Sequence, residues 1–570
     1  MAKLQFRLAR AAALFSAIVL AACAEPAAPP PEPSEDTRRT LAGGEIVGYL
    51  GTAGAQVWRA IPYAAPPVGD LRWAAPRPHP GWQGVFEALQ PPPRCPQRLN
   101  PLDQVDADRF GELVGEEDCL MLDVYAPSGA GPDDAPRPVM MWIHGGSNVW
   151  GYADQYDAGR LAQEQNVVVV VIQYRLGGLG FFAHPTLREA AETPNDGAAN
   201  FALLDMIAAL DWIGENAAAF GGDASRITIF GESAGGHNVA ALLASPLAQA
   251  KFHRAIIQSG LVDSMPLDLA EGSQGADPLA GLAVGERLGG PDIDAAGLRA
   301  PSLAAVFDAF PTDANGRYEP PRVIADGVSL PLEGMQAAFA QPDGFNAVPV
   351  ITGTNRDEMK LFNAIDPRYV RNFLGLFPQA RDRDLFDAVS DYQSRVWRIR
   401  AVDELAATLT GAGHEDVWAY RFDWDEGGRA FFTDTGHLLG AGHAMEIPFV
   451  FNRFEFFGDF DRYIFNDRNE DNRLALAGAM GGYWAAFARD GDPGPDWTRW
   501  NAEGALMRLD SPLGGGWAMV SGVDDMARLT SDLQQDIRLT DAQRCQVVDA
   551  VVEFYPPYGA MLADRVSCPA

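Results

Sequence analysis

The sequence predicts an α/β fold in which a mainly parallel, doubly wound central sheet lies between layers of helices. Two continuous apolar runs support this prediction, PVMMWIH at 138–144 and VVVVVIQY at 167–174. Runs of this kind are typical of strands that are buried on both faces of a parallel sheet. Helical patterns separate and follow them, so strand and helix alternate along the chain.

The other elements continue this alternation. Residues 156–165 have a helical pattern, and residues 200–220 carry apolar side chains at the spacing of an amphipathic helix. Residues 261–345 are rich in Ala, Gly, Asp and Pro, and we expect this insertion to lie above the sheet and shape a substrate gorge. Further strands are predicted at 226–230, 253–259, 348–352 and 417–422.

Length and composition indicate one large globular domain. The chain has 570 residues, 47% of them hydrophobic, with 13 Trp and 30 Phe, which is enough for an extensive core. No repeat or linker divides residues 41–570, so we expect a single domain there. The net charge of −32 argues against nucleic-acid binding, because a phosphate backbone would be repelled.

Residues 1–22 have the features of an export signal. Three basic residues precede an apolar segment at 11–22, which is too short to span a bilayer. The sequence LAAC at 20–23 resembles the lipobox of bacterial lipoproteins, which implies cleavage before Cys23 and lipidation of that cysteine. Residues 23–40 would then form a Pro-rich tether that anchors the domain to a bacterial membrane outside the cytoplasm. The alternative is a plain signal peptide cut near Ala22, which gives a secreted protein.

The cysteine count fits an oxidising compartment. Apart from Cys23 the chain has four cysteines, an even number that allows three disulfide pairings. We favour Cys95–Cys119 and Cys545–Cys568 because each pair closes a short local loop. Such a disulfide stabilises a fold by about 3 kcal/mol in the chain-entropy account.

The stretch RITIFGESAGG at 226–236 predicts a nucleophile elbow. A β-branched apolar run is followed by the G-x-S-x-G sequence around Ser233 and then by helix-forming residues. Strand, turn and helix in that order are the context in which this motif presents a reactive serine. The flanking glycines fit because the serine backbone is strained and larger neighbours would clash. The alternative for the motif alone is an ordinary strand-to-helix turn.

A serine hydroxyl needs a base to activate it, and the order along the chain in such folds is Ser, acid, His. Three histidines lie far enough downstream. His414 precedes a predicted strand, whereas His437 and His443 lie in a glycine-rich loop that suits a catalytic imidazole. The acid is expected just after the strand at 348–352, where Asp357 and Glu358 both qualify.

Four further motifs occur along the chain: IPYAAPPVGDLRWAAP at 61–76, CPQ at 95–97, EDCLMLDVYAP at 117–127 and FGGD at 220–223. Together with the elbow at 226–236 they resemble the type-B carboxylesterase and cholinesterase family, and the resemblance runs from about residue 43 to residue 509. This resemblance implies an α/β-hydrolase fold. It also favours His443, because GAGHAMEIPFVF at 440–451 is similar to the family's catalytic-histidine segment, and leaves His437 structural. By the same resemblance Glu358 is the acid, with Asp357 the runner-up, and Glu232 is a supporting acid beside the nucleophile.

An acyl-transfer site also needs N–H donors for the developing oxyanion. One is expected from Ala234, the residue after the nucleophile. By resemblance the others are the N–H groups of Gly146 and Ser147, with His144 holding the loop. The family has a third glycine and an aromatic residue where this chain has Ser147 and Asn148, so we expect a more polar pocket wall at Asn148.

A choline ester is not the expected substrate. Cholinesterases carry a tryptophan ten residues before the second cysteine of the first disulfide, where it binds a quaternary ammonium by cation–π attraction. Arg109 occupies that place here.

The sequence therefore predicts a serine carboxylesterase that hydrolyses small-molecule esters through an acyl-enzyme intermediate. No metal or organic cofactor is implied, since H-E-x-x-H, zinc-type Cys/His spacing and dinucleotide glycine motifs do not occur in the sequence. The alternative is a non-catalytic cholinesterase-like binding or adhesion module. The presence of serine, acid and histidine at all three triad positions argues against this alternative.

Overall fold

The computed structural model describes residues 30–103, 105–273, 277–312, 323–373, 377–566 and 568. The predicted signal peptide and Cys23 lie outside these residues. The chain divides into two compact units, Met1–Glu32 and Pro33–Ala570, and the account below concerns the second. The predicted domain boundary at residue 41 falls inside this second unit. Within the described residues no helix combines the length and apolar character needed to cross a membrane.

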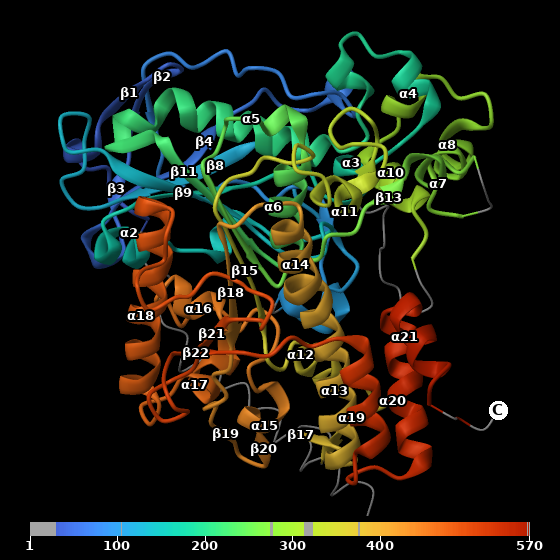
Figure 1. The fold of residues 1–570 in the computed structure, drawn as a ribbon. Coiled ribbons are helices and arrows are strands. Elements are labelled where there is room, and N and C mark those ends of the chain that lie inside the picture. Colours follow the sequence, from blue (N-terminus) through green and yellow to red (C-terminus); the bar gives the residue numbers. More distant parts are fainter. Residues whose placement is uncertain are drawn as a thin grey trace, which may run out of the picture. The chain divides into compact units, whose positions relative to one another are not determined.

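An eleven-stranded sheet forms the centre of the unit, as the apolar runs predicted (Figure 1). Its middle part is parallel, from β10 through β9, β11, β12, β15 and β18 to β21. The strands β8, β4 and β3 at one edge and β22 at the other run antiparallel to their neighbours. In sheet order the strands are β22 (Ala518–Val520), β21 (Leu506–Leu509), β18 (Val417–Phe422), β15 (Val350–Asn355), β12 (Arg254–Gln258), β11 (Gly222–Glu232), β9 (Arg137–Ile143), β10 (Val168–Ile172), β8 (Met121–Ala126), β4 (Gln56–Pro62) and β3 (Tyr49–Leu50).

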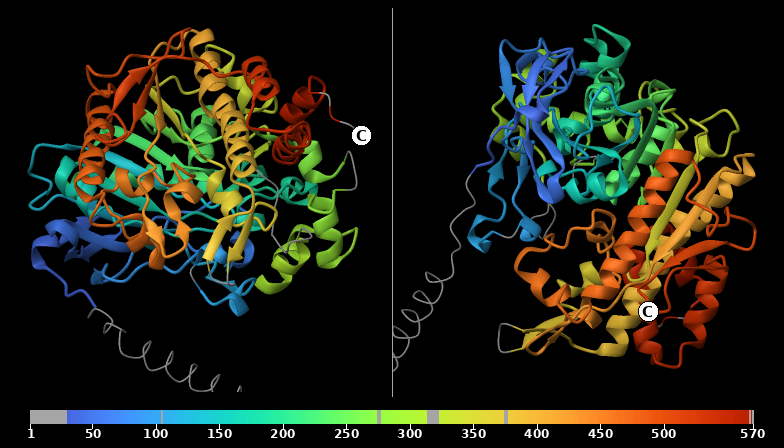
Figure 2. Two further views of the ribbon diagram at one scale, coloured as in Figure 1. Left: turned by 90° about the horizontal axis from the view of Figure 1, so that it is seen from below. Right: turned by 90° about the vertical axis from the view of Figure 1, so that its left-hand side faces the viewer.

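Helices cover both faces of this sheet, and side chains of β9 alternate between the two cores (Figure 2). One face packs against α5 (Phe201–Asn216), α6 (Ala234–Ala244), α11 (Gly334–Phe339) and α14 (Glu404–Gly411). The other packs against α2 (Gly159–Gln165), α16 (Ile447–Val450) and α18 (Glu470–Asp490). The doubly wound arrangement is therefore confirmed.

A third apolar core joins α13 (Arg383–Arg398) to three C-terminal helices, α19 (Met526–Gln535), α20 (Asp541–Phe554) and α21 (Pro556–Ala563). A π-helical turn, Ile399–Asp403, links α13 to α14. Both predicted disulfides are present, Cys95–Cys119 and Cys545–Cys568.

Short elements fill the connections. The described part of 261–345 contains short helices joined by irregular segments. These helices are α7 (Leu267–Glu271), α8 (Gly281–Gly289), α9 (Ala295–Arg299), α10 (Leu303–Ala309) and α11. Other short helices are α3 (Gly177–Gly180), α4 (Pro185–Glu189), α12 (Lys360–Ala364), α15 (Thr435–Leu439) and α17 (Asp461–Ile464). A separate small sheet contains the three strands β1 (Arg39–Leu41), β2 (Gly44–Val47) and β5 (Val85–Glu87). The two-stranded sheets are β6 (Gln97–Arg98) with β7 (Leu113–Val114), β13 (Met265–Pro266) with β14 (Ile324–Ala325), β16 (Val370–Phe373) with β17 (Phe377–Ala380), and β19 (Arg429–Ala430) with β20 (Thr433–Asp434).

The elbow strand differs from the prediction at its start. We predicted a strand from Arg226, but β11 begins at Gly222. Gly222 and Asp223 pair with Arg137 and Pro138 of β9 before the register shifts at a bulge. The extra residues of a bulge interrupt the regular alternation of side chains along a strand. The pattern of apolar residues therefore does not show that the strand continues through the bulge.

Candidate active site

Ser233 occupies a strained turn between the central strand β11 and helix α6. Its φ of 58° and ψ of −121° lie where residues other than glycine are rare. Close packing holds the turn in place, because a Cβ on Gly231 or Gly235 would come within 2.6 or 2.0 Å of the Ile143 carbonyl oxygen. The G-x-S-x-G sequence is thus a steric requirement of this crossing, and the serine projects where the parallel strands end.

The imidazole of His443 is held by Glu358. The Nδ1 atom lies 2.5 Å from Glu358 Oε2, and both side chains are buried. The other carboxylate oxygen, Oε1, accepts hydrogen bonds from Ser259 Oγ, Thr354 Oγ1 and the Asn355 N–H at 2.6 to 2.7 Å. Glu358 is therefore fixed in a single orientation, and it in turn orients the ring.

The Nε2 atom of His443 faces Glu232 in this structure. It lies 3.1 Å from Glu232 Oε1, whereas no hydrogen bond to the Ser233 hydroxyl occurs within the described chain. Since Glu232 directly precedes the nucleophile, Nε2 nevertheless lies beside the elbow. Hydrogen bonds between catalytic groups often tighten only once substrate is bound.

These acidic and basic groups perturb one another. Burial by itself would lower the pKa of His443, but the carboxylates of Glu232 and Glu358 outweigh it and raise that pKa to about 9. Burial raises the pKa of Glu232 to about 8, against the opposing effect of the His443 cation. Titratable groups with such strongly perturbed pKa values are typical of functional sites.

The structure places the other candidates for base and acid in contacts with other protein groups. His437 lies on α15, where its Nε2 is 2.8 Å from Asp387 Oδ1. Asp357 is paired with Arg356 at 2.7 Å, and its carboxylate accepts the N–H of Ala441 at 3.1 Å. Asp357 therefore fastens the histidine loop to the loop after β15.

The glycine turn after β9 lies against the nucleophile. A Cβ on Gly145 would be 3.2 Å from the Cβ of Ser233. Gly146, Ser147 and Asn148 all have positive φ, of 100°, 55° and 58°, so Ser147 adopts a conformation that glycine takes more easily.

Three backbone donors are left available around this turn. Among the described residues, the N–H groups of Gly146, Ser147 and Ala234 form no hydrogen bond. Ala234 is buried, Gly146 is half-buried and Ser147 is exposed. Because buried N–H groups are normally paired, the unpaired donor at Ala234 suits a site that receives an anionic oxygen, and the N–H groups of Gly146 and Ser147 are free to join it.

The expectation that Asn148 makes the pocket wall more polar is wrong. Its side chain is buried, and the two amide groups of Asn148 and Asn238 bond reciprocally at 2.8 and 3.3 Å. Because Asn238 lies on α6, this pair ties the glycine turn to the nucleophile helix. Tyr174 adds hydrogen bonds from its hydroxyl to the His144 carbonyl at 2.7 Å and to Asn148 Oδ1 at 3.3 Å.

His144 serves as a structural residue. Its ring stacks on Tyr174 at 4.5 Å between centroids, and Nδ1 lies 2.9 Å from the Gly145 carbonyl oxygen. Burial lowers the pKa of His144 to about 4, so the ring is neutral at physiological pH.

Several side chains surround His443, and the sequence did not predict its aromatic neighbours at the site. Trp397 and Phe362 pack against the ring at 4.8 and 5.2 Å between centroids. Glu446 is a third buried carboxylate, and its Oε2 accepts a hydrogen bond from the Asn355 amide at 2.6 Å. Glu446 lies in the GAGHAMEIPFVF segment that carries the family resemblance, and Asn355 follows the strand predicted at 348–352, whereas no sequence signal pointed to the aromatic contacts.

No group of three or more His, Cys, Asp or Glu side chains suited to a metal ion occurs in the described ranges.

Arg109, at the position where cholinesterases carry tryptophan, is exposed and pairs with Glu112 at 2.8 Å.

The parallel sheet, the strained serine turn and the buried His–Glu pair after later strands define an α/β-hydrolase. The model of the carboxylesterase family matches residues 35–374 and 364–513. The chain therefore belongs to the carboxylesterase family and is an ester-hydrolysing enzyme by class.

Relatives of known activity agree with this assignment. The chain is 32% identical to the fumonisin B1 esterase of Sphingopyxis macrogoltabida over 89% of its own length and 92% of the relative's. It is 31% identical to human cocaine esterase, with 83% and 87% of the two chains covered. A solved structure of a PNB esterase superimposes with a TM-score of 0.68 at 28% identity and covers 87% of this chain and 99% of that one.

Proposed function

We propose that the protein hydrolyses carboxylic esters through an acyl-enzyme formed on Ser233, with His443 as base and Glu358 as the orienting acid. One observation supports this more than any other. The buried Glu358 carboxylate holds the Nδ1 edge of His443 at 2.5 Å, which leaves Nε2 directed at the elbow that carries the only G-x-S-x-G serine.

In the first half-reaction Ser233 Oγ attacks the ester carbonyl and His443 Nε2 accepts its proton. The N–H groups of Gly146, Ser147 and Ala234 stabilise the tetrahedral oxyanion, each by about 3–4 kcal/mol. The proton on His443 then passes to the departing alcohol. In the second half-reaction His443 takes a proton from water, which attacks the acyl carbonyl. The bond between the acyl group and Ser233 Oγ then breaks, His443 returns the proton to Oγ, and the carboxylic acid leaves.

The substrate class is a small-molecule ester. Relatives are named for esters as different as cocaine and fumonisin B1, so the family name does not fix the acyl or alcohol part. Trp397 and Phe362, which pack against His443, favour an apolar group next to the reacting carbonyl.

Hydrolysis of a short p-nitrophenyl ester tests the mechanism. The Ser233→Ala variant should lose at least three orders of magnitude in kcat, by analogy with triad removal in serine hydrolases. Ser225→Ala is a matched control, because Ser225 lies on the same strand at its exposed start. Equal hydrolysis by wild type and Ser233→Ala would sink the mechanism and favour a non-catalytic binding module.

We also propose that the mature protein is lipid-anchored through Cys23 outside the cytoplasm. The basic and apolar segments of residues 1–22 and the LAAC sequence support this proposal. The Cys23→Ala variant should move from the membrane fraction to the soluble fraction of cells. If its membrane association is unchanged, the anchor is not at Cys23.

A further inference from the structure

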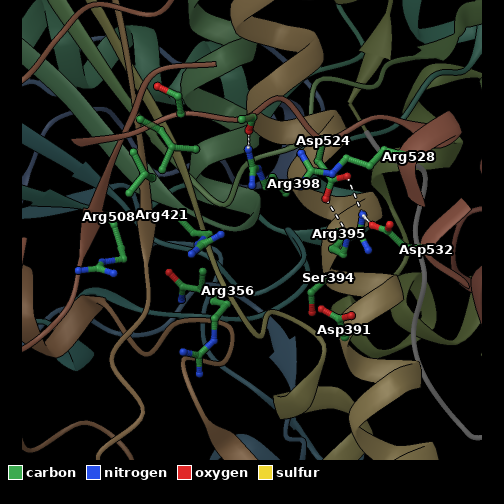
Figure 3. Close-up of a pocket in the computed structure, with 15 residues that line it drawn as sticks. Arg356, Asp391, Ser394, Arg395, Arg398, Arg421, Arg508, Asp524, Arg528 and Asp532 are labelled. Carbon is green, nitrogen blue, oxygen red and sulfur yellow. Dashed lines mark hydrogen bonds and ion pairs between the residues drawn. The ribbon is translucent and has the colours of Figure 1, made fainter. Parts of the chain in front are cut away.

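A cavity that does not include Ser233 lies behind the loops that carry Glu358 and His443. It has a volume of about 490 Å³, within the range of ~300–1,000 Å³ that small-ligand sites span. Neither Ser233 nor His443 lines it. Figure 3 shows that its side chains come from separate elements, including α13, β18, β21 and α19. Six of the lining residues are arginines: Arg356, Arg395, Arg398, Arg421, Arg508 and Arg528.

Four of these arginines use only one edge of the guanidinium group to bind protein carboxylates. In each of them Nε and Nη2 bond to an aspartate, while Nη1 forms no hydrogen bond among the described residues. The aspartates therefore balance charge but leave donors unused. The pairs are Arg356–Asp357, Arg395–Asp524, Arg398–Asp403 and Arg421–Asp423. Arg356 Nη2 also binds Asp425, at 2.8 Å.

Arg508 and Arg528 have no carboxylate partner within the described chain. Arg508 Nη2 donates only to the carbonyl oxygens of Gly515 and Gly516, at 3.0 and 3.3 Å. Its Nε is buried without a hydrogen-bond partner. Arg528 donates from Nη1 to the Val523 carbonyl at 3.3 Å. Arg528 is exposed, so its remaining donors face solvent. The buried Arg508 Nε is different, because a buried guanidinium N–H without an acceptor is costly and points to an acceptor that arrives from outside the chain.

Carboxylates in the cavity wall do not fill this role. Asp524 and Asp532 both bind Arg395, as the dashed contacts in Figure 3 show. Asp391 forms no ion pair in the part of the chain that the structure describes, and burial raises its pKa, which lessens its repulsion of an anion. The lining thus contains six guanidinium groups and three carboxylates, two of which share one arginine.

We propose that this cavity binds a small multivalent oxyanion, a molecule with two or more carboxylate or phosphate groups. Guanidinium groups match the oxygens of both in bidentate geometry, and several unused Nη1 donors around one cavity suit more than one such group. A monovalent anion would leave most of these donors unpaired.

The site contacts the catalytic loops directly. Asn355 lines the cavity, and its amide donates to the Gly442 carbonyl at 2.7 Å, next to His443. Ser394 also lines it, and its Oγ accepts the N–H of Met359, the residue after Glu358, at 3.0 Å. A bound oxyanion would therefore stabilise the segments that carry both residues.

Isothermal titration calorimetry on the purified full-length protein tests the proposal without depending on ester hydrolysis. The probes are citrate, pyrophosphate and acetate at matched ionic strength. Citrate, pyrophosphate or both should bind with one-to-one stoichiometry, while acetate should not bind at the same concentration. Binding of citrate alone identifies a polycarboxylate site, and binding of pyrophosphate alone identifies a phosphate site.

Variants locate the bound ion. The double variant Arg508→Gln/Arg528→Gln should weaken binding by about tenfold or more, since each lost contact is charge-assisted. Ser521→Glu adds a negative charge at the exposed rim without removing any contact of the core, and it should also weaken binding. Arg160→Gln, an exposed arginine on α2, should have no effect.

Ser233→Ala should bind the oxyanion as wild type does, because Ser233 is not part of the cavity. Thermal unfolding without ligand checks that the variants are folded. Absence of binding by both citrate and pyrophosphate, or equal affinity in wild type, the double variant and Ser521→Glu, would overturn the proposal.

Discussion

Replacing Glu232 by Gln should move the acid limb of the pH–rate profile to lower pH. As the proposed base, His443 accepts a proton only in its neutral form, so kcat/KM should rise as pH passes through the pKa of His443 in the free enzyme. Glu232 lies 3.1 Å from Nε2 and is the foremost of the carboxylates that raise that pKa. The wild-type limb is therefore expected above 6.5, and removing the charge should lower it.

The magnitude follows from the geometry. Two unit charges 3.1 Å apart interact by about 5 kcal/mol at an effective dielectric constant of about 20. Glu232 has a pKa raised to about 8, so it carries only part of its charge near neutral pH, and the two groups titrate together. Glu358 still raises the pKa of His443 in the variant. We therefore expect a shift of about one to two pH units, equivalent to about 1.4–2.7 kcal/mol.

Measurements of kcat/KM for a short p-nitrophenyl ester across the pH range would detect this shift. Glu232→Asp keeps the charge and should preserve most of the wild-type limb. Asp387→Asn removes a carboxylate next to His437 instead and serves as the remote control. A limb that stays in place in Glu232→Gln, or moves to higher pH, would refute the electrostatic account.

Three further predictions concern the histidine choice, the elbow and a disulfide. His443→Ala should lose most ester hydrolysis and His437→Ala should keep it; the reverse would make His437 the base. Gly235→Ala should abolish activity and soluble expression, since its Cβ would lie 2.0 Å from the Ile143 carbonyl, and wild-type levels of both would contradict the packing argument. Cys545→Ser should lower the thermal midpoint, because the disulfide closes a loop with a sequence separation of 23, worth about 3 kcal/mol; calorimetry with and without reductant checks this.

Local features of the sequence were enough to predict much of the protein. A continuous run of apolar residues predicts strands such as β10, because a strand covered on both faces must be apolar throughout. All five residues of β10 are buried, as this requires. The elbow could be read from five residues because a strained serine turn tolerates only glycine at its tight contacts. Disulfide pairing also followed from local loop closure.

Other features depend on which residues the fold brings together. The orientation of His443 Nε2 toward Glu232, the Asn148–Asn238 pair and the packing of Trp397 on the imidazole join residues from separate elements. No period or spacing in the chain encodes such contacts, since they arise only when strand ends and helices meet at one edge of the sheet. The arginine cavity is the clearest case, because its six guanidinium groups are spread from residue 356 to residue 528 and share nothing in sequence but their charge. The sequence thus determined which residue types could carry out the chemistry, and the tertiary structure decided which of them touch.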